Sequence, residues 1–263
     1  MWRLRPLLAF TLVVCSLWIV CAKLVGDDRV FPGPRHIWET SLGSFSRFGP
    51  SLLETRIEGA KVLLIHTAIT VGRIVIGTIG GLFAVLVATY VYWAVPNARS
   101  LLAGFSQISR GIPLLAIIPL FVFWFGGSPL GIYTYIAFGV YVVSLPTALA
   151  GVDLMSPQWV EAARIYRLSS ASLFLRVVVP GAFPFVSVGL RSSIGLCWAF
   201  SLGGEYLVAR DGLGYLASLS YIHADMGKLI CLLVIYGSLG LASNKLLAAI
   251  VNAKQSNTRK LRT

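Results

Sequence analysis

The sequence has little charge and few residues of the types that bind metals or carry out catalysis. Only 12% of its 263 residues are charged, about half of the ~25% that is usual in soluble domains. A water-soluble domain of this length needs a polar surface, and the few charges here are clustered. The composition therefore excludes an ordinary soluble protein and predicts that apolar segments face lipid.

Cysteine and histidine are too scarce and too scattered to form a metal centre. The four cysteines lie in apolar runs with no Cys-x-x-Cys spacing, so they indicate neither a disulfide framework nor a zinc site. They are Cys15, Cys21, Cys197 and Cys231. The three histidines, His36, His66 and His223, are far apart along the chain. A membrane-embedded enzyme, which would need such residues clustered at one depth, is disfavoured.

The sequence also lacks a phosphate-binding loop. Its only Gly-Lys pair, Gly227-Lys228, is followed by Leu229 rather than Ser or Thr. The chain therefore cannot bind and split ATP by that means, and we expect it to bind no cofactor and to have no catalytic residues. If an ATP-driven process involves it, ATP and Mg²⁺ must be bound by another polypeptide.

Long apolar stretches dominate what is present. Hydrophobic residues make up 57% of the chain, and the mean hydropathy is +0.80. A helix needs about 20 apolar residues to cross a bilayer. Six stretches predict membrane spans in an all-α bundle forming one transmembrane domain over residues 1–263: Pro6–Leu24, Ile74–Val95, Ile112–Phe125, Leu130–Val152, Phe185–Val208 and Leu229–Val251.

Two of these stretches allow more than one interpretation. The first span, within residues 1–25, follows Arg3 and Arg5 and so also resembles a signal peptide, but no small-residue cleavage pattern follows it. The third is short, and Pro113 and Pro119 predict a locally broken helix packed against its neighbours.

Basic residues set the expected orientation. If the amino terminus is placed in the cytoplasm, more Lys and Arg residues lie on the cytoplasmic side than on the outer side, as is usual in membrane proteins. The tail at 252–263 is basic and has no acid, which indicates contact with anionic lipids. Nucleic-acid binding is a weaker alternative, because no soluble basic domain is present to form a groove. We expect both termini to be cytoplasmic and residues 26–73 to form an extracytoplasmic loop and a lead-in helix, with Pro32 and Pro34 in extended structure and the helix starting near Leu52.

The polar interruption at 153–184 is the most informative segment. Ser156 is a natural N-cap with Pro157 at the first helical position, predicting a helix to about Leu168. A second short helix is expected from Ser170 to Pro180. Together these helices would form a cytoplasmic docking knob, or an ordinary amphipathic connector. In the knob, Ala162 and Ala163 would offer a flat surface, and Trp159, Val160, Tyr166 and Leu168 would fill a pocket.

Four ionisable residues near or inside the spans are candidates for a translocation path. They are Arg73, Arg110, Arg191 and Glu205. Such residues are costly in lipid and usually face the interior of a bundle. They could line a path for an anion, or serve as interfacial anchors and internal ion pairs. Gly77 and Gly81, four residues apart, indicate close helix packing.

Residues 161–191, EAARIYRLSSASLFLRVVVPGAFPFVSVGLR, resemble the EAA motif of binding-protein-dependent ABC importer permeases. Further stretches resemble the nitrate, sulfonate and taurine branch of that family in the same order along nearly the whole chain. They are Phe31–Pro34, Thr70–Gly77, Arg110–Gly126, Gly189–Arg191, Glu205 and Gly212–Leu216. Two departures stand out: Arg167 occupies the place of the usual Gly, and Val179-Pro180 that of Leu-Pro.

The resemblance implies that 153–184 is a coupling loop that sits in a groove of a cytoplasmic ATPase subunit. The coupling residues it implies are Trp159, Glu161, Ala162, Ala163, Tyr166, Arg167 and Leu168. A Gly at 167 would allow a left-handed turn that Arg adopts only at a cost of ~1 kcal/mol or more. The turn therefore lies at Ser169-Ser170 instead, or the partner carries a complementary acid.

The resemblance also implies a bacterial inner-membrane permease with several partners. They are two ATPase subunits, an extracytoplasmic solute-binding protein and a second permease copy, identical or related. The implied solute is a small oxyanion such as a sulfonate, taurine, nitrate or bicarbonate. An ATP-independent secondary transporter or channel is the alternative, which inverted repeats or deep acids would favour.

Overall fold

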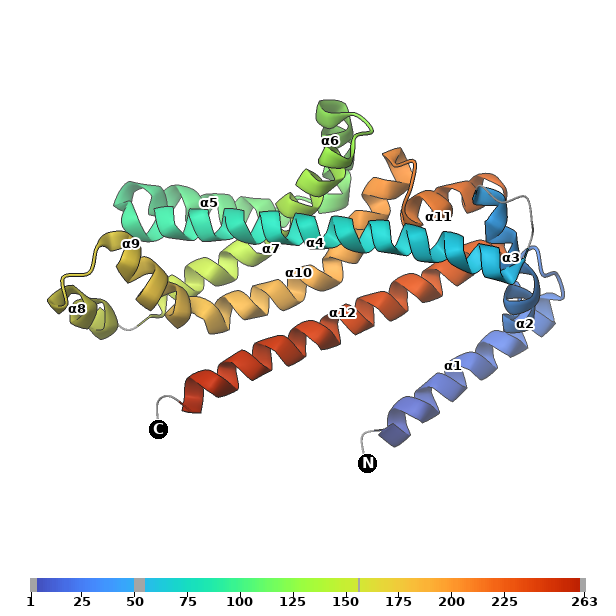
Figure 1. Ribbon diagram of the computed structural model, residues 1–263, viewed down its shortest axis with the longest axis horizontal. Helices are drawn as coiled ribbons and strands as arrows, with labels where there is room; N and C mark the ends of the chain where they lie inside the picture. The colour runs from blue at the N-terminus through green and yellow to red at the C-terminus, as the bar shows by residue number, and fades with distance from the viewer. Residues whose placement is uncertain (1–3, 50–54, 156, 261–263) are drawn as a thin grey trace. The chain divides into compact units, whose positions relative to one another are not determined.

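The computed structural model describes residues 4–49, 55–155 and 157–260, and every regular element in these ranges is helical (Figure 1). Four helices among them are long and apolar enough to cross a membrane, and a bent pair over residues 96–125 makes a fifth if it counts as one span. The predicted all-α membrane fold is confirmed. The described residues form two compact units.

The first unit comprises residues 1–70 and 210–237. The first predicted span forms helix α1, whose apolar part is described over Leu12–Val25. After it the chain makes short helical turns rather than the extended loop expected at Pro34. Pro34 instead begins a helix, because its fixed φ suits a first helical position, where no N–H partner is needed. The elements are α1 (Leu4–Val25), α2 (Pro34–His36), η1 (Ile37–Ser41), α3 (Leu42–Ser44), η2 (Phe45–Phe48), α11 (Leu213–Ile222) and the first parts of α4 and α12.

The second unit comprises residues 71–209 and 238–263. Helices α7 and α10 make extensive contact in it. The predicted spans at 130–152 and 229–251 are confirmed as parts of α7 and α12. The elements are α4 (Arg56–Ala94), α5 (Pro96–Gly111), η3 (Leu114–Ile117), α6 (Ile118–Phe125), α7 (Pro129–Asp153), α8 (Pro157–Ile165), α9 (Ser170–Leu173), η4 (Phe174–Val178), α10 (Val179–Val208) and α12 (Met226–Lys260).

Glycines let α4 approach α7 closely in this unit. A Cβ atom at Gly77 would lie 2.6 Å from the side chain of Ile136, and one at Gly81 would lie 2.6 Å from the carbonyl oxygen of Ala137. No larger residue fits either position without moving a neighbour. The interpretation of the two glycines as packing residues is confirmed.

The predicted span at 112–125 is only one arm of a bent pair. The other arm is α5, which the sequence analysis missed because its amphipathic sequence, PNARSLLAGFSQISRG, lacks a long apolar run. The two arms meet at 95°. A break was predicted from Pro113 and Pro119. It lies at Pro113, where the preceding Ile112 is extended (φ −90°, ψ 121°), as expected for a residue that precedes proline, whereas Pro119 lies in the first turn of α6.

The predicted helix end at Pro180 is wrong. Residues 170–208 are helical without interruption, so the span expected from Phe185 begins well before that residue. Pro180 lies in the first turn of α10, directly after the π-turn η4. Because the wide π-turn alters the spacing of the preceding carbonyl groups, the ring of a proline is accommodated there.

Candidate functional site

Helix α8 lies at one end of the second unit, where the chain passes from α7 toward α10 (Figure 1). It begins at Pro157, as predicted, while the expected N-cap Ser156 lies outside the described residues. It ends at Ile165, three residues before the predicted Leu168. The following helix α9 is capped by Ser169, whose hydroxyl accepts a hydrogen bond from the backbone N–H of Ser172 at 3.3 Å.

Arg167 takes the left-handed backbone conformation that the sequence analysis associated with glycine. Its φ is +54°, whereas Ser169 is extended, with φ −62° and ψ 153°. The turn after α8 therefore lies at Arg167 and not at Ser169-Ser170. This conformation costs a non-glycine residue roughly 1 kcal/mol or more, so the surrounding packing must hold it in place.

One face of α8 is seated on the bundle. Ala163 is only 7% exposed and belongs to a buried apolar cluster, and Val160 and Leu168 pack against the same cluster. The other buried members are Ala88, Tyr92, Leu145, Leu149, Val152, Leu173, Phe174 and Val178. Ala163, which we expected to offer a surface to a partner, instead fixes α8 against its own chain.

Three large apolar side chains of α8 and of the turn directly after it are exposed. The exposed fractions are 58% for Trp159, 81% for Ile165 and 80% for Tyr166. Trp159 and Ile165 belong to α8, and Tyr166 lies in the turn that follows it. Glu161 is exposed as well, and the side chain of Ala162 lies outside the described residues. Ile165 was not predicted as a contact residue, because the sequence does not show which face of α8 is buried against other helices.

A polar cavity of about 400 Å³ adjoins α8. Arg99, Asp153 and Glu161 contribute its charged groups. The hydroxyl of Tyr92 donates a hydrogen bond to Asp153 at 2.8 Å, and the guanidinium of Arg99 lies 5.3 Å from the centre of the Tyr92 ring. These contacts join α4, α5 and α7 beneath α8. The sequence analysis had not assigned Arg99 or Asp153 a site, because their proximity depends on the helix packing.

The structure brings together only two of the four candidate path residues. Arg73 of α4 and Glu205 of α10 form an ion pair at 3.0 Å, with side chains 4% and 0% exposed. The hydroxyl of Ser201 also donates to Glu205, at 3.3 Å. Of the two interpretations offered for Arg73 and Glu205, the structure therefore shows the internal ion pair.

The other two path candidates lie apart from that pair. Arg110 is exposed at the end of α5, where its Nε donates to the carbonyl oxygen of Ser106 at 3.2 Å. Arg191 is half-buried in α10, and its side chain donates to the amide oxygen of Asn252 in α12 at 2.8 Å. The four side chains do not form one charged path in this conformation.

The geometry at α8 is suited to binding a protein, and no group of three potential metal-ligating side chains occurs in the part of the chain that the structure describes. Comparison with known proteins identifies the family. Residues 77–257, more than half of the chain, match the family described as the inner membrane component of binding-protein-dependent transport systems. The chain belongs to this family.

Several family members are similar in sequence. A probable ABC transporter permease of Brucella melitensis is 34% identical over 58% of this chain and 62% of its own length. The nitrate import permease protein NrtB of Synechococcus elongatus is 25% identical over 94% and 89%. The taurine transport system permease protein TauC of Escherichia coli is 31% identical over 46% and 44%. The matches to the Brucella protein and to TauC each span less than two thirds of the relative's length.

The fold also matches a solved transporter. In a structure described as an inward-facing conformation of the MetNI methionine ABC transporter, one chain superposes with a TM-score of 0.61 over 74% of this chain and 96% of its own length. Its sequence identity is 18%, so the match establishes the permease-type fold alone.

Proposed function

We propose that this family member is the membrane-spanning subunit of an ATP-driven importer, and that residues 157–168 dock onto a separate cytoplasmic ATPase. The observation that carries the proposal is that α8 is seated on the bundle and still exposes large apolar side chains. Ala163 is held in the apolar cluster, while Trp159, Ile165 and, in the following turn, Tyr166 are exposed. Large exposed aromatic side chains on a rigid element are typical anchors of protein interfaces.

The position of α8 also suits the transmission of motion. Its apolar cluster includes residues of α4, α7 and η4, and the chain continues without a break from α9 through α10. A displacement of α8 would therefore be passed to several spans at once, as a rigid-body movement of packed helices requires. Ala163 and Leu168 act here by seating the helix, and Trp159, Glu161, Ile165 and Tyr166 provide the contact.

For the solute, we propose a small oxyanion such as a sulfonate, taurine or nitrate. The similar permeases NrtB and TauC are named for nitrate and taurine. Because Arg73 is paired with Glu205, the proposed path depends on Arg110 and Arg191 in the present conformation. A solute-binding protein on the outer side would deliver the solute, and a second permease copy would complete the path.

Copurification tests the docking proposal. The chain, carrying an affinity tag, is co-expressed with its genomic neighbours, and the amount of ATPase retained is measured. We expect the ATPase to copurify with the wild type, and Tyr166→Ala and Trp159→Ala each to weaken its binding by about thirtyfold or more, since losing an interface anchor costs ~2 kcal/mol or more. Phe123→Ala is the matched control, because Phe123 is an equally exposed aromatic residue of α6.

Two outcomes would contradict the proposal. Retention of the ATPase by both α8 variants at the wild-type level would show that α8 is not the docking element. Solute uptake by the purified chain without any ATPase or ATP would instead establish the secondary-transporter alternative.

A further inference from the structure

A second cavity, of about 590 Å³, lies in the first unit at the end of α1. This volume is in the ~300–1,000 Å³ range of small-molecule sites. One wall is formed by Ile19, Ala22 and Lys23 of α1. The other wall is formed by residues between 28 and 40, including Asp28, Arg35 and Glu39. Nothing in the proposed docking or transport function uses this cavity.

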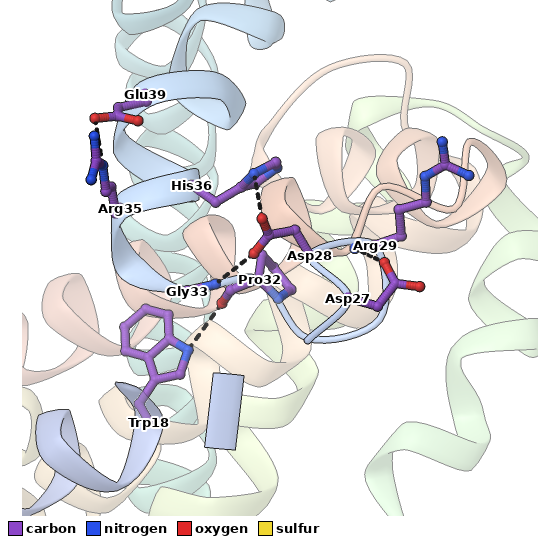
Figure 2. Close-up of polar contacts among 9 residues, drawn as sticks. All are labelled: Trp18, Asp27, Asp28, Arg29, Pro32, Gly33, Arg35, His36 and Glu39. Atoms are coloured by element: carbon purple, nitrogen blue, oxygen red, sulfur yellow. Dashed lines mark hydrogen bonds and ion pairs between the residues drawn. The ribbon is translucent and has the colours of Figure 1, made fainter. Parts of the chain in front are cut away.

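The two walls of the cavity are joined by specific contacts (Figure 2). The indole Nε1 of Trp18 donates a hydrogen bond to the carbonyl oxygen of Pro32 at 3.1 Å. A Cβ atom at Gly33 would lie 3.6 Å from the side chain of Ala22, so the backbone there approaches α1 closely. Asp28 accepts from the backbone N–H of Gly33 at 3.5 Å and lies 3.4 Å from His36. The cavity therefore has defined walls on both sides.

Charges of both signs line the cavity. Glu39 pairs with Nε of Arg35 at 2.9 Å, which uses one of the five N–H groups of the guanidinium. The ammonium of Lys23 makes no hydrogen bond or ion pair to any residue in the described ranges, and the ion-paired guanidinium of Arg35 keeps N–H groups that its bond to Glu39 does not use. The site can therefore offer cationic donors to an anion and the carboxylates of Asp28 and Glu39 to a cation at the same time.

An apolar stripe leads from the cavity along α1. Ile19 lines the cavity, and Cys15 and Leu12 lie four and seven residues before it, which places all three on one helix face. All three are exposed, Leu12 to 67%. Lys23, near the end of this apolar helix, is the type of residue found where a span meets the membrane surface. Polar groups above an apolar stripe match the two parts of a lipid molecule.

We propose that this cavity binds the headgroup of phosphatidylethanolamine, a phospholipid that joins a phosphate to a primary ammonium. Lys23 and Arg35 contact the phosphate, Asp28 and Glu39 accept hydrogen bonds from the ammonium, and an acyl chain covers Ile19, Cys15 and Leu12. The lipid thereby holds the outer segment at 28–40 against the end of α1. A free zwitterion such as taurine shares the headgroup chemistry, but it would leave the apolar stripe uncovered.

Native mass spectrometry of the purified full-length chain, titrated with single lipids, tests this assignment. We expect phosphatidylethanolamine to bind at least about tenfold more tightly than phosphatidylcholine, because the trimethylated nitrogen of the latter has no N–H to donate. The variant Lys23→Gln/Arg35→Gln should bind phosphatidylethanolamine about tenfold or more weakly, the effect of losing one charge-assisted hydrogen bond or more.

Arg29→Gln is the matched control. Arg29 is an exposed arginine of the same segment (Figure 2) that does not line the cavity, so its variant should bind the lipid as the wild type does. Glu39→Gln separates the two halves of the headgroup, because it should reduce the preference over phosphatidylcholine while leaving phosphatidylcholine binding unchanged.

Three results would overturn the assignment. The first is that the wild type binds phosphatidylethanolamine and phosphatidylcholine equally well. The second is that the Arg29 control loses as much phosphatidylethanolamine binding as the double variant. The third is that millimolar taurine or O-phosphoethanolamine displaces the lipid and that the wild type shows no preference among lipids. The last result would make the cavity a site for a soluble zwitterion. None of these measurements involves the ATPase, so the proposal fails or holds independently of the docking function.

Discussion

The ion pair between Arg73 and Glu205 provides a quantitative test of the bundle. The side chains are 3.0 Å apart and nearly completely buried. At an effective dielectric constant of about 20, their Coulomb attraction is roughly 5–6 kcal/mol. Removal of one partner takes away the buried counterion of the other, which costs about 3–5 kcal/mol. We therefore expect Glu205→Leu and Arg73→Met each to destabilise the protein strongly.

The double variant separates pairing from packing. Arg73→Met/Glu205→Leu removes both charges and keeps apolar volume, so its stability should return to within about 1–2 kcal/mol of the wild type. For a chain of this size, the single variants should lower Tm by roughly 6–20 °C. The assay is thermal unfolding of the purified chain in a mild detergent or nanodisc, with the coupling energy taken from the four-variant cycle.

An exposed pair on the same helix is the control. Lys61 and Glu58 of α4 are closer, at 2.6 Å, but are 60% and 26% exposed. Their coupling energy should not exceed about 0.5 kcal/mol. If the effects of Arg73→Met and Glu205→Leu simply add in the double variant, the reasoning from burial is refuted and the contact contributes nothing as a pair.

Three further predictions concern single positions. Gly81→Leu should destabilise the chain by about 1–3 kcal/mol in the same unfolding assay, because α4 and α7 must separate, while Gly72→Ala, with open space around it, should be neutral or slightly stabilising. Arg167→Gly should raise the unfolding free energy by up to about 1 kcal/mol, since its φ is positive, and no gain would indicate that the turn is not strained. Lys228→Met should lower the unfolding free energy by about 1–2 kcal/mol, because the buried ammonium lies 4.3 Å from the centre of the Phe48 ring. A Lys228→Met variant with an unchanged Tm would contradict a stabilising cation–π contact.

Hydrophobic length was sufficient to locate most spans. The runs at 130–152 and 229–251 are apolar for longer than a soluble helix requires, so they correspond to α7 and α12. Amphipathic α5 escaped detection because its polar residues interrupt the run. The prediction that a helix ends at Pro180 was wrong, because a proline in the first turn of α10 does not interrupt the helix where a π-turn precedes it.

The candidate site was predictable as a segment but not as a surface. The Ser-Pro start and the polar break located α8, but the turn after it was expected at Ser169-Ser170 and lies at Arg167. Which face of α8 is available depends on long-range packing, since Ala163 is buried by residues from α4, α7 and η4. In the same way, Arg73 and Glu205 are 132 positions apart in sequence, and nothing local indicates that they pair.

Site-directed photo-crosslinking tests the docking of α8 most directly. The photo-reactive residue p-benzoylphenylalanine replaces Tyr166 or, as a control, Phe123. Both variants are made in cells that also produce the ATPase subunits. The account predicts an ultraviolet-dependent adduct with the ATPase from position 166 and none from position 123. Absence of that adduct, together with labelling of Tyr166→Cys by a membrane-impermeant maleimide in intact cells, would contradict it.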